Sequence, residues 1–412
     1  MASLPGRLRR LPALAAALAQ LAQAAGSFAL QVVAAHALGA SGLGTISLCL
    51  GTTILTTAVT SGLVGDSLTV LDRHDRRVRA ALQAWLVVVT LAGSVGAALV
   101  LDLTGVLTGG EAVLFAVATA AFQVEEVLRR VLMAVQRFWT LLVVDGVAVA
   151  TTLLSLLLVE EIGVGSFLLS VAVGQAAGIV VALAVLPRAE RRLVPLRGAA
   201  LREVIAFGGW RGAQVALTPT GLTISRFVLL GATGAVALGE VEAGRILGAP
   251  ALLVVQGLGS YLLSTYARDH ALPLDVLRAR ARRASLAMAG TAVALGVVVT
   301  ALTPFLAPLA VGRAIDVHLV TVAGWALFAA ATATMQPFAS LAVTRGSQRA
   351  VFGLRALDVV VGTGLLALAL GPIGLAAPLT PLVLAVGPVL SGVLVRTVVL
   401  RTPGADRSEG QS

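Results

Sequence analysis

Charged residues, aromatic residues, lysine and cysteine are all scarce in this chain of 412 residues. Only 12% of the residues are charged and 58% are hydrophobic, whereas an ordinary soluble domain carries about 25% charged residues. This composition excludes a disordered chain, which needs high charge and low hydrophobicity, and it excludes an ordinary soluble enzyme. The 30 basic residues are all arginine and give a net charge of +10. Because they lie in short loops between apolar runs, we expect no nucleic-acid partner.

The only cysteine, Cys49, lies within an apolar stretch, so the chain can form no internal disulfide and no thiolate metal site. The four histidines are scattered, with no spacing typical of metal binding. The sequence contains no G-x-x-x-x-G-K-[ST] phosphate loop and no H-E-x-x-H motif. It therefore predicts neither an enzyme nor a bound cofactor.

Long apolar runs are abundant instead, and a membrane helix needs about 20 mostly apolar residues. The runs are continuous rather than alternating, which excludes a transmembrane β-barrel. We predict an all-α integral membrane protein with twelve transmembrane helices, near residues 11–36, 44–70, 80–101, 112–134, 139–159, 164–186, 204–232, 240–266, 285–309, 318–343, 351–371 and 374–396.

The positions of the arginines test the predicted number of transmembrane helices, because the cytoplasmic loops of membrane proteins are enriched in positive charge. Most of them fall before the first run, after every even-numbered run and at the chain end, whereas the opposite loops hold only Arg313. The alternation predicts an inner (plasma) membrane protein with both termini in the cytoplasm. A signal peptide cleaved near Ala22-Gln23-Ala24 is an alternative, but the apolar run continues to Ala37.

The gap at 187–203 divides the runs into six and six, an arrangement that many transporters build from repeats. Two internal sequence similarities support a duplication. Gln123 precedes Asp145 by 22 residues, and Gln336 precedes Asp358 by the same number. Glycine-rich segments also follow both the first and the seventh run. We predict two six-helix bundles (1–186 and 204–400), a cytoplasmic linker (187–203) and a disordered cytoplasmic tail (401–412).

Polar side chains gather in the first two runs of each half. Such groups usually face a bundle interior or a water-filled cavity, because lipid cannot satisfy them. Asp66 in the second run is either a local ion-pair residue or a coupling-ion site. The predicted cavity-lining side chains are the glutamines Gln20, Gln23, Gln31, Gln214 and Gln256.

Among the arginines inside the predicted helices we single out Arg211, Arg226 and Arg245, because a charge deep in a membrane helix costs at least about 2.5–3.5 kcal/mol. Arg211 and Arg226 flank Pro219 and Gly221, which predict a kink or break, and Arg245 follows Glu242 by three residues. Cations beside a broken helix suit an anionic substrate; the alternatives are snorkelling to the interfaces and a local Glu242–Arg245 pair. The run Glu125, Glu126, Arg129, Arg130 reads as two i,i+4 ion pairs in a structural turn, with a proton relay as the minority interpretation.

The pattern resembles the multidrug/oligosaccharidyl-lipid/polysaccharide exporter superfamily, and within it the polysaccharide flippases of O-antigen and teichoic-acid type. The motifs that carry the resemblance are Ala34-Ala35-His36-Ala37-Leu38-Gly39 with Gly42-Leu43-Gly44, and Arg129-Arg130 followed by Ala134, Gln136-Arg137 and Asp145.

The resemblance implies a central cationic cavity lined by the first, second, seventh and eighth helices, and alternating access driven by membrane potential or by a gradient of H⁺ or Na⁺. It implies export of undecaprenyl-diphosphate-linked oligosaccharide, with Arg211, Arg226 and Arg245 binding the diphosphate. The implied partners are the bilayer, the lipid-linked glycan and polysaccharide assembly enzymes. Three alternatives stay open: a major-facilitator transporter, favoured by Asp72-Arg73-His74-Asp75-Arg76-Arg77, a drug/cation antiporter, and a non-transporting partner of a cell-envelope enzyme complex.

Overall fold

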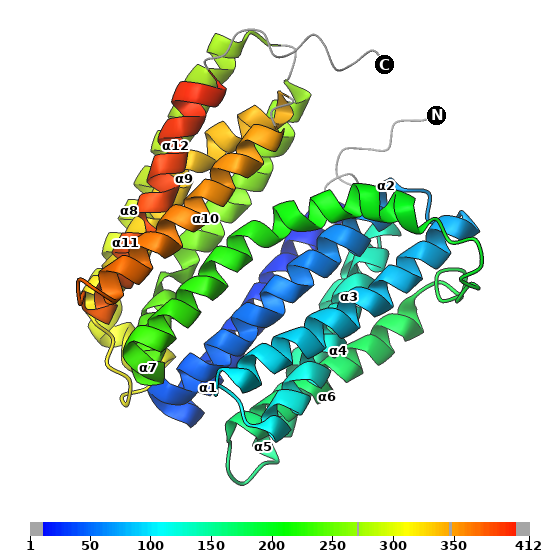
Figure 1. The fold of residues 1–412 in the computed structure, drawn as a ribbon, viewed down its shortest axis with the longest axis horizontal. Coiled ribbons are helices and arrows are strands. Elements are labelled where there is room, and N and C mark those ends of the chain that lie inside the picture. Colours follow the sequence, from blue (N-terminus) through cyan, green and yellow to red (C-terminus); the bar gives the residue numbers. More distant parts are fainter. Residues whose placement is uncertain (1–10, 270–271, 346–347, 401–412) are drawn as a thin grey trace. The chain divides into compact units, whose positions relative to one another are not determined.

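The computed structural model describes residues 11–269, 272–345 and 348–400, and the regular elements in this part of the chain are all helices (Figure 1). The predicted tail 401–412 lies outside the described residues. In chain order the helices are α1 (Leu11–Thr60), the π-helical turn η1 (Ser61–Gly65), α2 (Asp66–Val70), α3 (Arg76–Leu103), α4 (Gly109–Ala134), α5 (Phe138–Leu157), α6 (Val164–Val185), α7 (Leu201–Arg268), α8 (Leu274–Ala310), α9 (Leu319–Thr344), α10 (Gln348–Leu370), the 3-10 turn η2 (Ala377–Leu379), α11 (Thr380–Leu384), α12 (Val386–Leu394) and the π-helical turn η3 (Val395–Val399).

Nine helices in the described part are long and apolar enough to cross a membrane. Helix α3 shows how they suit a lipid environment. Its outward side chains include Val87, Leu91, Val95 and Leu99, which are all exposed and recur at a spacing of four, whereas Thr90 and Ser94 are buried. A helix with an apolar exposed stripe and small polar residues on its buried side is typical of a membrane bundle. The fold is therefore that of an all-α, multi-pass membrane protein.

Glycine redirects the two longest helices. Gly39 within α1 has φ 65° and ψ −167°, and Gly234 within α7 has φ 85° and ψ 174°. Only glycine adopts such positive-φ conformations without steric cost. Both residues fall in the glycine-rich segments whose similarity suggested a duplication.

The helices form two compact units. The first consists of Met1–Leu38 and Thr45–Pro219, and the second of Gly39–Gly44 and Thr220–Ser412. The division falls inside α7, so the helical residues 201–219 pack with the first unit. The loop before them is tied to α3, where Gln83 donates from Nε2 to the Arg192 carbonyl and accepts from the Val194 amide, both at 3.1 Å.

The first unit has a core of branched aliphatic side chains drawn from its successive helices, among them Leu63, Leu82, Leu132, Leu141 and Leu186. In the second unit two clusters serve the same purpose. One surrounds Phe338 and Leu341 of α9, and the other consists mostly of alanine around Met288 and Val255. Small residues allow close helix packing where lipid provides no hydrophobic driving force between helices.

Helix α7 does not break at Pro219 and Gly221, since it continues through both residues, and its non-helical backbone lies at Gly234 instead. A kink at Pro219 stays a prediction. Gly221 has a packing role, because an added Cβ there would lie 3.0 Å from Cγ2 of Val359 on α10. Proline is tolerated within membrane helices because neighbouring groups satisfy the freed carbonyl.

Within the first unit, η1 and α7 meet through glycines. A Cβ added to Gly62 would lie 2.4 Å from the Cα of Gly212, whereas a Cβ added to Gly96 of α3 would meet nothing within 4 Å. We therefore expect Gly62→Ala to lower the free energy of unfolding by about 1–3 kcal/mol through overpacking. Gly96→Ala, the matched control, should be neutral or stabilising, because alanine favours a helix over glycine by up to about 1 kcal/mol. Apparent melting temperatures in one detergent compare the two; equal shifts would show that η1 and α7 do not pack this closely.

Candidate functional site

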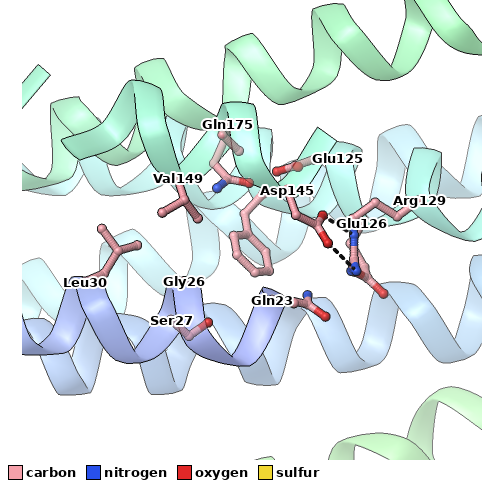
Figure 2. Close-up of a pocket in the computed structure, with 12 residues that line it drawn as sticks. Gln23, Gly26, Ser27, Leu30, Glu125, Glu126, Arg129, Asp145, Val149 and Gln175 are labelled. Carbon is pink, nitrogen blue, oxygen red and sulfur yellow. Dashed lines mark hydrogen bonds and ion pairs between the residues drawn. The ribbon is translucent and has the colours of Figure 1, made fainter. Parts of the chain in front are cut away.

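A cavity of about 60 Å³ lies within the first unit, among α1, α4, α5 and α6 (Figure 2). Its polar lining comes from all four helices. The contributing polar side chains are Gln23 and Ser27 of α1, Glu125, Glu126 and Arg129 of α4, Asp145 of α5 and Gln175 of α6. Three carboxyl groups and one guanidinium thus surround a space in the middle of a helix bundle.

Arg129 is held between two of these carboxylates. Its Nη1 donates to Oε2 of Glu126 at 2.6 Å, its Nη2 donates to Oδ2 of Asp145 at 3.1 Å, and its Nε lies 2.7 Å from Oδ1 of Asp145. Only 3% of the Arg129 side chain is exposed. The contact to Asp145 consists of one hydrogen bond from Nη2 and a close approach of Nε, which itself makes no hydrogen bond, and it joins α4 to α5.

Of the two i,i+4 ion pairs predicted on α4, one is confirmed and one is wrong. Arg130 Nε donates to Oε1 of Glu126 at 3.0 Å. Glu125, however, makes no ion pair with Arg129, because that guanidinium is turned toward Glu126 and Asp145. The rotation of α4 places the Glu125 carboxyl against α6, where a Cβ added to Gly178 would lie 2.7 Å from Oε1.

Asp66 joins the helix α4 to α7. Nε of Arg211 lies 2.6 Å from Asp66 Oδ2, and Nη1 of Arg130 lies 3.5 Å from Oδ1. The π-helical turn η1 ends directly before Asp66 and sets the rotation at which this side chain leaves the helix. An unbroken chain of ion pairs therefore runs through the first unit: Asp145, Arg129, Glu126, Arg130, Asp66 and Arg211.

The other two predicted arginines meet in the second unit, on α7. Arg226 donates from Nε and Nη2 to the two carboxylate oxygens of Glu242, at 2.8 and 3.3 Å, and Nε of Arg245 donates to Oε2 of the same carboxylate at 2.5 Å. The exposed side-chain fractions are 9%, 3% and 22% for Arg226, Glu242 and Arg245. Two guanidinium groups share one carboxylate, so this triad carries one positive charge in excess.

The predicted glutamines have different surroundings. Gln23 lines the cavity of the first unit, and Gln214 accepts a hydrogen bond from Arg211 at 3.3 Å. Gln20 is exposed, and Gln31 donates to the Ser27 carbonyl one turn earlier, at 3.1 Å. The side chain of Gln256 lies outside the described residues.

The sequence analysis assigned no site role to three residues of these clusters. Glu242 was considered only as a partner of Arg245, Asp145 only as part of the internal repeat and of the motif that carries the family resemblance, and Gln175 not at all. The shared 22-residue spacing did point to Asp145. The contacts of Gln123 and Asp145 are not repeated in the second unit, where Gln336 accepts a hydrogen bond from Nη2 of Arg355 at 3.2 Å. There Asp358 lies instead against α12, since a Cβ on Gly387 would be 2.0 Å from its Oδ1.

The fold matches solved structures of the MOP superfamily of transporters. A multidrug resistance MATE family transporter in its inward-facing conformation matches with a TM-score of 0.72 at 12% identity, over 90% of this chain and 92% of that one. Lipid II flippase MurJ matches with a TM-score of 0.70 at 10% identity, over 93% and 86%. A MOP superfamily transporter from Pyrococcus furiosus matches with a TM-score of 0.61 at 11% identity, over 93% and 92%. No protein-family model and no curated protein sequence matches the chain.

The triad predicts unequal costs for removing its members. Glu242→Gln leaves the buried Arg226 guanidinium without a carboxylate, so we expect a loss of about 3–5 kcal/mol in the free energy of unfolding. Arg245→Gln, the matched control, leaves the bidentate Arg226–Glu242 pair intact and should cost much less. Apparent melting temperatures of the two purified variants measure this difference. A cost for Arg245→Gln as large as that for Glu242→Gln would contradict the assignment of Arg226 and Glu242 as the buried pair.

Proposed function

We propose that this protein is a membrane transporter that exports undecaprenyl-diphosphate-linked oligosaccharide for cell-surface polysaccharide synthesis, by alternating access. The fold shared with MOP superfamily transporters supports a transporter. The excess positive charge of the Arg226–Glu242–Arg245 triad supports an anionic substrate, and this is the observation that carries the proposal.

The triad suits a diphosphate for a specific reason. A buried guanidinium binds phosphate oxygens through charge-assisted, often bidentate hydrogen bonds. Glu242 binds Arg226 through both carboxylate oxygens and Arg245 through Oε2. Arg245 is also the most exposed of the three, so we assign it the first contact with the diphosphate. A role for Arg211 in substrate binding stays a prediction, since its guanidinium is held by Asp66.

We propose twelve membrane crossings with both termini in the cytoplasm of a cell with an inner membrane. The two apolar segments Leu18–Val70 and Leu201–Gly259 contain 53 and 59 residues. At 1.5 Å per residue each is more than twice as long as the roughly 30 Å hydrocarbon core. Counting each as two crossings, divided at Gly39 and Gly234, and adding the charged helix α4 brings the nine apolar helices to twelve.

A drug/cation antiporter is the second candidate, and the likeness to a multidrug resistance transporter favours it. Such a protein takes cationic substrates, which an excess positive charge repels. The major-facilitator alternative gains no support from the three structures compared above. The remaining proposed partners are the bilayer itself and the enzymes that assemble and polymerise the glycan.

Arg245→Gln tests the substrate without breaking the buried pair. Losing one charge-assisted hydrogen bond of about 1.5–3 kcal/mol should reduce translocation of undecaprenyl-diphosphate-linked oligosaccharide in proteoliposomes about ten- to a hundredfold. Arg245→Lys keeps the charge without the bidentate geometry and should restore part of the rate.

Two outcomes of the same assay would overturn the proposed substrate. One is native protein that translocates none of several undecaprenyl-linked substrates. The other is native protein that exports a cationic dye at a rate that Arg245→Gln leaves unchanged, which would establish the antiporter instead.

A further inference from the structure

We propose that residues 187–200, which join α6 to α7, form a binding surface for the headgroups of anionic phospholipids. The exposed arginines of this joining segment bind the lipid phosphates, and Leu193 and Leu196 lie among the acyl chains beside them. The inference goes beyond the proposed function, because it concerns the bilayer lipids around the first unit rather than the transported compound.

The first observation is a pair of exposed leucines on a fixed backbone. Leu193 is 86% exposed and Leu196 is 59% exposed. Gln83 of α3 holds both neighbours of Leu193, since it binds the carbonyl of Arg192 and the amide of Val194. The backbone is thus fixed on both sides of an exposed leucine. Apolar surface is unfavourable in water, and moving it among acyl chains removes that cost.

Further contacts hold both ends of the joining segment at the start of α3. Near its beginning, an ion pair of 3.4 Å joins Glu190 to Arg73. Near its end, Nε of Arg77 donates to the Gly198 carbonyl at 3.1 Å, and the Arg77 carbonyl accepts from the Ala200 amide at 3.1 Å. The surface is therefore already ordered, so a lipid that binds it does not have to order the chain first.

The position along α3 places the joining segment at the edge of the membrane. The outward apolar stripe of α3 begins at Val87, and the residues that hold the segment, from Arg73 to Trp85, all precede this stripe. Trp85 is partly buried, and its Nε1 donates to the Leu201 carbonyl at 3.1 Å. Because tryptophan is enriched where a membrane meets water, the segment lies at the level of phospholipid headgroups.

The second observation is an excess of positive charge on this surface. Residues 71–79 and 187–198 contain eight arginines and three carboxylates. Glu190 is in an ion pair, and Asp72 and Asp75 accept hydrogen bonds from backbone amides. Four exposed arginines have no ion-pair partner in the part of the chain that the structure describes: Arg76, Arg188, Arg192 and Arg197. Like charges gathered in this way repel one another, and an anionic ligand removes the repulsion.

An anionic phospholipid fits the leucines and the arginines together. Anionic membrane surfaces attract clusters of arginine, and apolar side chains next to such clusters enter the acyl boundary. A soluble anion would bind the arginines but leave Leu193 and Leu196 in water, and a zwitterionic lipid would leave the excess charge in place. Arg76 adds to the preference, since it stands in the first turn of α3, where the helix dipole favours an anion.

A fluorescent label at position 193 tests this inference. Cys49 is buried, so Cys49→Ala combined with Leu193→Cys gives one reactive thiol for the environment-sensitive dye NBD. The purified protein in a neutral detergent is titrated with phosphatidylglycerol or with phosphatidylcholine. We expect phosphatidylglycerol to shift the NBD emission to shorter wavelength at concentrations at which phosphatidylcholine does not. Arg192→Gln should raise the half-effective concentration of phosphatidylglycerol about fivefold.

The chain offers a matched control for the label and another for the arginine. Leu158 is also 86% exposed, but the loop that follows it contains Glu160 and Glu161 and no arginine. A label at Leu158→Cys should therefore respond equally to the two lipids. Arg313→Gln removes an exposed arginine of another loop and should leave the titration unchanged.

Four results would overturn the inference. The first is an equal response to both lipids at position 193, and the second is an unchanged half-effective concentration in Arg192→Gln. The third is the same emission shift with inorganic phosphate, which would indicate an anion site without membrane contact. The fourth is a shift that follows protein concentration in the absence of lipid, which would indicate that a second copy of the chain covers the leucines.

Discussion

The ion pair between Arg129 and Asp145 is the contact on which the first unit depends. A charge within a membrane helix is costly unless a partner neutralises it, and here the carboxylates of Asp145 and Glu126 flank a guanidinium that is 3% exposed. It joins α4 to α5, and it also directs Arg129 away from Glu125. Because Glu126 binds both Arg129 and Arg130, the same contact begins the chain that reaches Asp66 and Arg211. One pair thus links the packing of α4 against α5 to the chain of ion pairs.

The two units differ in the charge balance of their ion-pair clusters. The three carboxylates and three guanidinium groups of the chain in the first unit balance, whereas the triad in the second unit has one positive charge in excess. In our account the triad takes the phosphate groups of a lipid. Both clusters include arginines of α7, Arg211 in one and Arg226 with Arg245 in the other.

The sequence predicted the helical membrane fold because runs of about 20 apolar residues have few other uses. It also predicted that charged residues inside helices matter, and the structure brings Arg226 and Arg245 to one carboxylate. It could not reveal that Arg129 turns to Asp145 rather than Glu125, because that choice depends on the rotation of α4 against α5. Gln175 gave no signal, since a single amide in an apolar run is common. The sequence also did not reveal that the backbone of α7 leaves helical geometry at Gly234 rather than near Pro219, because proline can lie within a helix, whereas a positive φ at glycine interrupts it.

The most direct test of the account is whether the protein moves an anionic lipid. Native protein in proteoliposomes would be given undecaprenyl-diphosphate-linked oligosaccharide and, separately, a cationic dye, and the translocation rate of each measured. The account predicts translocation of the lipid-linked oligosaccharide and none of the dye. Transport of the dye alone, or of neither compound, would contradict it.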